Sequence, residues 1–267
     1  MPLTESDLDV LRDAYSKLEN PSLAIRLSSM AGTQVEAVVK QLSKSAPTGL
    51  VEAVADSSQR AIEFVMTNSA KTLSGNEGVP ASPRLHKAAA ATTGAVAGFF
   101  GLATLAIELP LTTAIMFRSI VDIARAEGES PRDHETILNA MQVFAMGSDQ
   151  STKDDGADTS YYGIRLALSK TVSETLQYLA THSASKASAP ALVRFISAIA
   201  TRFGVVVTQK AMAQALPVVG AVGGGLVNTI FISHFQDMAR GHFAIRRLER
   251  EYGVDAVRDR YRELEDE

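Results

Sequence analysis

Two long stretches of this chain carry no charged side chain, and they limit what it can fold into. Residues 88–107 hold no Asp, Glu, Lys or Arg over 20 positions, and residues 211–236 hold none over 26. Both are long enough to cross a bilayer as a helix. The first, however, is rich in Ala, Gly and Thr, and the second is interrupted by Pro217 and glycines, so insertion into lipid gains little free energy. They suit either two tightly packed core helices or segments that insert into or touch a membrane.

Small residues recur four positions apart in both stretches. Gly94 is followed by Gly98, and Gly220 is followed by Gly224. Glycines at this spacing lie on one side of a helix and let a second helix backbone approach closely. We therefore predict that these four glycines mark close helix crossings.

The periodicity of apolar residues predicts helices throughout. Thr4 and Asp7 form a capping-box-like start, and Gly253 is a stop signal before a last short helix. The clearest amphipathic stripe at helical spacing consists of Tyr161, Ile164, Leu168, Val172, Thr175, Leu176 and Leu179. No segment alternates with the period of two that is typical of strands.

The expected architecture is an all-α, single-domain helical bundle over residues 1–267, built around the two Ala/Gly-rich helices. Residues 1–30 are expected to form a peripheral N-terminal helix. Residues 147–160, which are acidic and lack any period, are expected to form a flexible loop.

Charge is unevenly spread along the chain. Residues 163–210 hold six basic side chains and one acidic one, whereas residues 88–162 hold four basic and ten acidic ones. The basic segment either pairs with the acidic one inside the fold or faces an anionic surface such as lipid headgroups. Arg194, Arg202 and Lys210, which follow Pro190 at steps of eight residues, are the candidates for membrane contact. Each step advances about 80° around a helix, which suits a helix lying in a membrane interface.

Glu108 is the most informative single residue. It follows the first uncharged stretch directly and precedes Leu109 and Pro110. An ionised carboxylate between apolar segments must be paired, hydrogen-bonded or protonated. Arg118, Asn228 and His234 are the predicted partners. Glu108 is then either a structural ion pair or helix-end carboxylate at the Pro110 break, or a polar anchor for a ligand or a proton-active group.

Several classes of chemistry are excluded or lack a motif. The chain has no cysteine, so thiolate catalysis, thiolate metal sites and disulfides are excluded, and it has no tryptophan. His134 and Glu135 begin like a zinc-protease helix, but Leu138 stands where the second histidine belongs. We found no metal, nucleotide or other cofactor motif and no nucleic-acid site. The N-terminus lacks the basic and apolar regions of a signal peptide, which predicts a cytoplasmic location.

Two motifs in order give the chain a family resemblance. The first runs through Gly98-Phe99-Phe100-Gly101-Leu102-Ala103, Glu108-Leu109-Pro110, Arg118-Ser119-Ile120, Ile123-Ala124 and Gly128. The second runs through Leu216-Pro217-Val218-Val219-Gly220-Ala221, Gly224-Gly225, Asn228, Ala239, Phe243, Leu248-Glu249 and Tyr252-Gly253. Residues 31–262 thereby resemble the EcsC family, in which an aspartate usually stands at the position of Glu108. This family takes its name from a protein encoded beside an ABC-type exporter, so the resemblance implies a membrane-linked context and no defined reaction.

These observations favour a non-enzymatic accessory protein at the cytoplasmic face of the membrane. Its partner is expected to be membrane lipid or a membrane protein. The alternative is a peptidase-like hydrolase that uses Glu108 with His234 or His134. An enzyme requires those groups to converge in one pocket, whereas a binding protein requires an apolar groove or exposed patch.

Overall fold

The structure is a computed structural model that describes residues 3–19, 23, 26, 48–73, 102–147, 161–182, 189–214 and 224–265. Its elements in chain order are α1 (Glu5–Glu19), α4 (Thr48–Leu73), α6 (Leu102–Ala126), α7 (His134–Gln142), the 3-10 turn η1 (Val143–Ala145), α8 (Tyr161–Leu179), α9 (Pro190–Gln214), α11 (Gly224–Tyr252) and α12 (Val254–Glu263). The described residues contain no strand. The predicted all-α fold is therefore confirmed.

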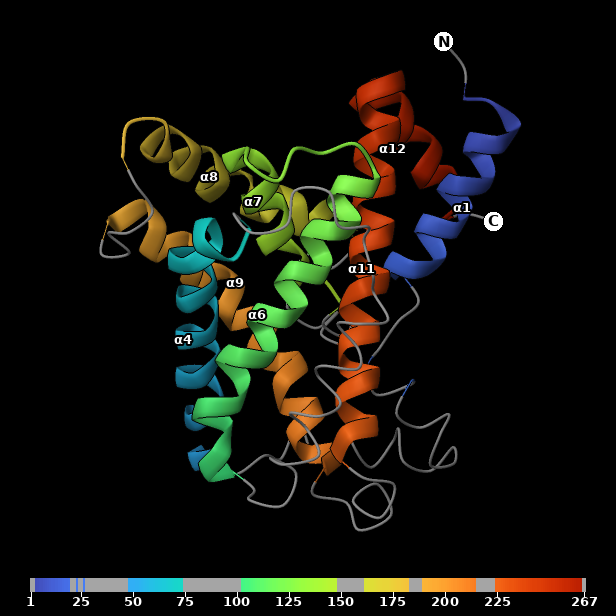
Figure 1. Cartoon of the computed structure of the whole chain (residues 1–267). Helices are drawn as coiled ribbons and strands as arrows, with labels where there is room; N and C mark the ends of the chain where they lie inside the picture. The colour runs from blue at the N-terminus through green and yellow to red at the C-terminus, as the bar shows by residue number, and fades with distance from the viewer. Residues whose placement is uncertain are drawn as a thin grey trace.

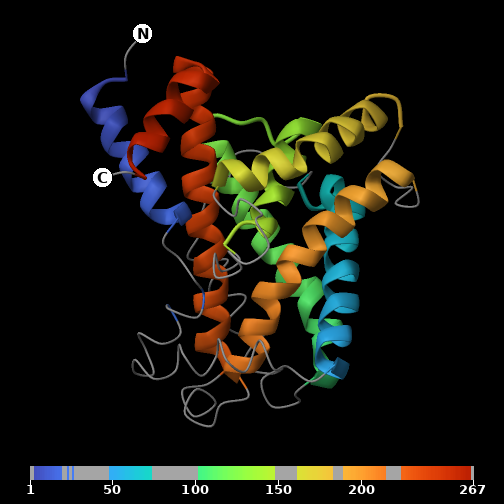
Figure 2. The same cartoon turned by 180° about the vertical axis from the view of Figure 1, so that it is seen from behind.

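Four long helices form the body of the molecule (Figure 1). α4 packs against both α6 and α9, and α11 packs against α6 and α9. We call the end where α4, α6 and α11 begin and α9 ends the lower end. The shorter helices α1, α7, α8 and α12 gather at the opposite, upper end (Figures 1 and 2).

The centre of the core is a cluster of phenylalanines. Phe144, Phe203, Phe231 and Phe235 are fully buried, and their ring centroids lie 5.2 to 6.2 Å apart in tilted or edge-to-face pairs. Burying each such ring contributes about 1.5–3 kcal/mol, and the favourable ring geometry adds to this. Because the four residues come from η1, α9 and α11, the cluster ties the long helices to the element that follows α7.

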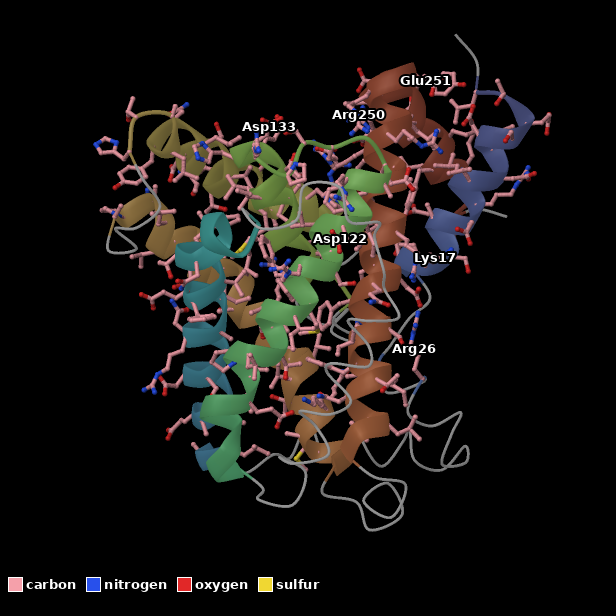
Figure 3. The ribbon with its side chains drawn as sticks, viewed as in Figure 1. Lys17, Arg26, Asp122, Asp133, Arg250 and Glu251 are labelled. Atoms are coloured by element: carbon pink, nitrogen blue, oxygen red, sulfur yellow. The ribbon has the colours of Figure 1, made fainter. Side chains whose placement is uncertain are left out.

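The upper end holds most of the ion pairs. Glu129 accepts hydrogen bonds from Arg246 and Arg250, and Glu127 accepts one from Arg247, so the turn after α6 is attached to α11. Arg258 also pairs with Asp255 within α12. Figure 3 shows the labelled Asp133, Arg250 and Glu251 at this end.

The two ends of the chain lie together at the upper end. The hydroxyl of Tyr252 donates to Asp7 at 2.7 Å, and that of Tyr261 donates to Glu19 at 2.7 Å. α1 crosses α11 closely at Gly241, where an added Cβ would lie 2.7 Å from Cγ of Leu18. The first helix is therefore an integrated part of the upper layer.

Several local predictions are confirmed at helix ends. The Asp7 amide donates to Oγ1 of Thr4 at 3.2 Å, as the capping motif requires. Gly253 separates α11 from α12 with a φ of 89°, a left-handed value that favours glycine. The expected break at Pro110 is wrong, because α6 runs through this proline from residue 102 to residue 126. Proline removes one backbone N–H from the helix, which costs about 3 kcal/mol in a helix interior, and burial of Leu109 and Met116 offsets that cost.

Candidate functional site

A buried ion pair lies in the lower half of the bundle. Nζ of Lys210 on α9 donates to Oε1 of Glu108 on α6 at 3.2 Å, and the two side chains are 2% and 10% exposed. The ammonium group also lies 4.7 Å from the centroid of the Phe231 ring on α11. Three helices therefore meet at this one charge, which is held by a carboxylate on one side and an aromatic face on the other.

The surroundings of Lys210 oppose its charge. Burial lowers the pKa of Lys210, and the carboxylate of Glu108 partly offsets this shift. The pair is thus a neutral unit placed among apolar side chains. Such a unit connects α6 and α9 in one geometry, since each ion would be unfavourable alone.

The partner of Glu108 differs from the predicted ones. Arg118 lies ten residues further along α6, which is about 15 Å of helix rise, and so is too distant to share the site. Asn228 is fully buried on α11 one turn before Phe231, on the same side of the helix. The cation that pairs with Glu108 is therefore Lys210.

Neither histidine of the hydrolase alternative meets Glu108 in the described residues. His234 is fully buried, and its ring lies against the backbone of Gly147. Burial lowers the pKa of His234 to about 3, so the ring is neutral. His134 is exposed at the first residue of α7. α6 places Glu108 about 27 Å of helix rise from its own upper end, near which α7 begins.

The three basic residues proposed for membrane contact all lie on α9, but in different environments. Arg194 is exposed and pairs with Glu174 of α8, its Nη2 lying 2.6 Å from Oε2. Arg202 is half-buried and donates to the carbonyl of Ala198. The prediction that Lys210 faces a membrane is wrong, because its side chain lies inside the bundle. Its pairing with Glu108 is instead one contact between the basic and acidic segments.

The glycine predictions fall mostly outside the described residues. Gly94, Gly98 and Gly220 lie there, as do most of residues 88–107 and all but Gly147 of the expected loop 147–160. Gly224 is the first residue of α11, and its surroundings are not described. Among the described glycines, close approaches are found at Gly147 and Gly241.

The second uncharged stretch is partly placed. Its last 13 residues begin α11, and Val227, Phe231, Ile232 and Phe235 are buried there. Among the described residues, the helix that is long and apolar enough to cross a membrane spans Pro190–Met212 of α9, with half of its most apolar window buried. Core helices of soluble proteins also have these properties.

A groove runs between α4 and α9 on the surface of the bundle. It has a volume of about 410 Å³, and its lining is Val51, Val54, Ala55 and Gln59 of α4 with Ser197, Ala200, Thr201, Gly204, Val205 and Thr208 of α9. The lining holds no ionisable side chain. Among the described residues, this feature corresponds to the apolar groove that a binding protein would require.

Sequence reasoning missed a second buried polar cluster, at the upper end. The Tyr161 hydroxyl lies 3.0 Å from Nδ1 of His242 and accepts a hydrogen bond from Arg165, which forms a two-pronged ion pair with Glu249. Burial lowers the pKa of His242 well below its ordinary value. These residues belong to α8 and α11. The sequence did contain a signal for this cluster. Tyr161 and His242 occupy positions on apolar helix stripes, and a polar group at a buried position needs a hydrogen-bond partner.

The comparisons with known proteins leave the function open and define the family. No curated protein matches the chain. No solved structure matches it either. A family profile does match, over residues 17–248, from the last turn of α1 to the upper part of α11. This match spans most of the chain and includes Glu108, Lys210 and Asn228. The chain therefore belongs to the EcsC protein family.

Proposed function

We propose that this chain is a non-enzymatic accessory protein at the cytoplasmic face of the membrane. It contacts the lipid surface, or a protein embedded in it, through the outward face of α9. Lipid is the partner that we test first. If the protein does not bind lipid, the same experiments would identify a membrane protein as its partner.

The observation that carries this proposal is the character of α9. The helix has the length and composition of a membrane-crossing segment, and half of its most apolar window faces outward. Val193 and Val205 are 43% and 47% exposed on it. Its basic residues outside the core are Arg194, which is exposed, and Arg202, which is half-buried, and its 25 residues include no Asp or Glu. An apolar helix with basic residues and no acidic ones is typical of helices that lie in a membrane interface.

The distribution of charged residues on the neighbouring helices also favours α9 as the helix that contacts the membrane. From Leu102 to Phe117, α6 has Glu108 as its one charged residue, and the first 13 residues of α11 have none. α4 differs, because Glu52 and Asp56 are exposed near its beginning. The contact is therefore assigned to α9 and not to the outer face of α4.

Vesicle flotation tests the proposal directly. The protein is mixed with phosphatidylcholine vesicles containing increasing fractions of phosphatidylglycerol and centrifuged through a density step. Val205→Glu places a charge on the outward face of α9 and should abolish flotation. The matched control is Val254→Glu, which changes the same residue type at 50% exposure on α12 and should float like the parent.

The basic residues are tested separately. Each charge near an anionic surface contributes about 1 kcal/mol, so Arg194→Gln with Arg202→Gln should weaken binding at least tenfold on phosphatidylglycerol vesicles and little on phosphatidylcholine. The difference should disappear at high salt. Absence of flotation on every vesicle would overturn lipid binding. Retention in native membranes despite that result would identify a membrane protein as the partner.

A further inference from the structure

The groove between α4 and α9 has one wall on each helix. Its α9 wall runs from Ser197 to Thr208, about 16 Å of helix rise, and its α4 wall runs from Val51 to Gln59, about 12 Å. The two helices run in opposite directions and cross obliquely (Figures 1 and 2). Gly204 faces α4 at the floor, where an added Cβ would lie 3.6 Å from Oγ of Ser58.

The volume of the groove suits a small ligand. A volume of about 410 Å³ falls within the range of about 300–1,000 Å³ that is typical of small-molecule sites. The groove is therefore large enough for a single hydrocarbon chain.

The chemistry of the lining agrees with the dimensions. Val51, Val54, Ala55, Ala200 and Val205 supply apolar surface, and no ionisable group is present. An extended peptide would bring an N–H and a C=O with every residue, and each would need a hydrogen-bond partner. Four polar side chains line the groove, and two of them, Thr201 and Thr208, already donate to carbonyls of their own helix.

An arginine in an ion pair with Glu174 lies beyond one end of the groove. Arg194 precedes Ser197 by one turn and lies on the same face of α9, because three residues rotate a helix by about 300°. Its guanidinium uses Nε and one Nη2 hydrogen on Glu174. Arginine has five N–H donors, so three remain for an anionic group placed at this end.

We propose that this groove holds one hydrocarbon chain of a membrane amphiphile whose anionic headgroup lies beside Arg194. The inference deepens the proposed function and depends on it for the source of the ligand. The shared chemistry is an acyl chain with a carboxylate or phosphate headgroup. A free fatty acid and a lipid in a bilayer both supply it, and the experiment separates the two.

The chain contains no tryptophan, so one introduced tryptophan reports on a single place. Val205→Trp puts it at the rim of the groove, and Val254→Trp puts it on α12 as a control of similar exposure. The probe is 9,10-dibromostearate below its micelle concentration, since bromine quenches tryptophan on contact. Quenching is expected at position 205 and not at position 254. Unbrominated stearate should compete and should not quench.

Two further substitutions in the Val205→Trp protein test where the chain binds and what holds its headgroup. Ala55→Phe fills the groove from an exposed lining position and should weaken probe binding at least tenfold. Arg194→Gln should weaken binding of the acid about fivefold and leave binding of its methyl ester unchanged. Equal quenching at positions 205 and 254, or none up to the solubility limit, would overturn the proposal.

Vesicles made with dibrominated phosphatidylglycerol distinguish the source and separate this inference from the proposed function. Quenching by these vesicles that Ala55→Phe removes identifies a bilayer lipid as the occupant. Quenching by dibromostearate alone identifies a free fatty acid. If Ala55→Phe floats with vesicles like the parent while the Val205→Trp protein shows no quenching with either probe, the membrane contact stands and the groove assignment is wrong.

Discussion

Lys210 and Glu108, 102 residues apart in sequence, form an ion pair with 3.2 Å between Nζ and Oε1 inside the lower half of the bundle. Both ions have left water, so their mutual attraction must offset two desolvation penalties. The contact of the ammonium with the Phe231 ring adds to that attraction. The stability of the lower half therefore depends on the two residues as a pair more than on either one.

Removing one member of the Lys210–Glu108 pair should lower the free energy of unfolding much more than removing both. Lys210→Met leaves a carboxylate buried without its cation and should lower the free energy of unfolding by about 3–5 kcal/mol. Adding Glu108→Leu should restore most of that loss, because a matched apolar pair needs no desolvation of charge. Urea denaturation of the parent, the single variant and the double variant measures this. Additive losses in the double variant would show that the ions are not coupled.

Stability should fall as the pH drops below about 6.5. Burial lowers the pKa of His234 to about 3 and that of His242 well below its ordinary value. The unfolded chain therefore binds protons that the folded chain does not, and folding loses free energy as pH falls through the unfolded value of about 6.5. At pH 5 His234 should cost about 2 kcal/mol, and His242 should act in the same direction.

The slope of the free energy of unfolding against pH separates the protonation of His234 from any loss of stability that the substitution itself causes. Between pH 6.5 and 5, His234→Gln should lower the slope by about one proton, whatever its stability at pH 7. The matched control is His182→Gln, which removes an exposed histidine and should leave the slope as in the parent. An unchanged slope in His234→Gln would mean that His234 is protonated in the folded protein.

Gly241→Ala should weaken the attachment of α1. The new Cβ would lie 2.7 Å from Cγ of Leu18 and 3.1 Å from the carbonyl oxygen of Ala14, which is backbone and cannot rotate away. Overpacking of this kind costs about 1–3 kcal/mol. Limited proteolysis within α1 should accelerate together with a lower melting temperature. Gly49→Ala, also in a helix but with nothing within 4 Å of its Cβ, should cause no loss.

Gly147→Ala should be destabilising for two separable reasons. Gly147 has a φ of 76°, and a Cβ there would overlap Nε2 of His234. His234→Ala in the same chain removes the overlap and leaves the backbone strain of about 1–2 kcal/mol. Thermal denaturation of both singles and the double should therefore show a non-additive pair. Independent, additive losses would show that the histidine ring has moved aside.

Helix type and many helix ends could be predicted from sequence because they depend on local chemistry. The Thr4 cap, the stop at Gly253 and the stripe from Tyr161 to Leu179 each follow from spacing within one helix. The break expected at Pro110 failed for a non-local reason. Packing of the flanking residues outweighs the missing backbone hydrogen bond.

The partner of Glu108 depends on how separate helices meet, which spacing within a helix does not contain. A signal was nevertheless present for Lys210. Ile199, Phe203 and Val206 are buried at helical spacing on α9, and Lys210 is the next member of that stripe. A lysine on a buried stripe requires a buried acid, and Glu108 is the acid in the lower part of α6. The prediction that Lys210 lies at the surface was wrong because it considered only the charge of this residue.

The hydrogen bonds that join Asp7 to Tyr252 and Glu19 to Tyr261 span 245 and 242 residues. A ribosome makes α1 long before α11 and α12, yet the surfaces that cover α1 belong to those two helices. α1 must therefore wait, without its native partners, until α11 and α12 have emerged. Contacts of such long sequence separation slow folding, because the chain must close a large loop before they form. The upper layer of this fold is completed only after translation has passed α12.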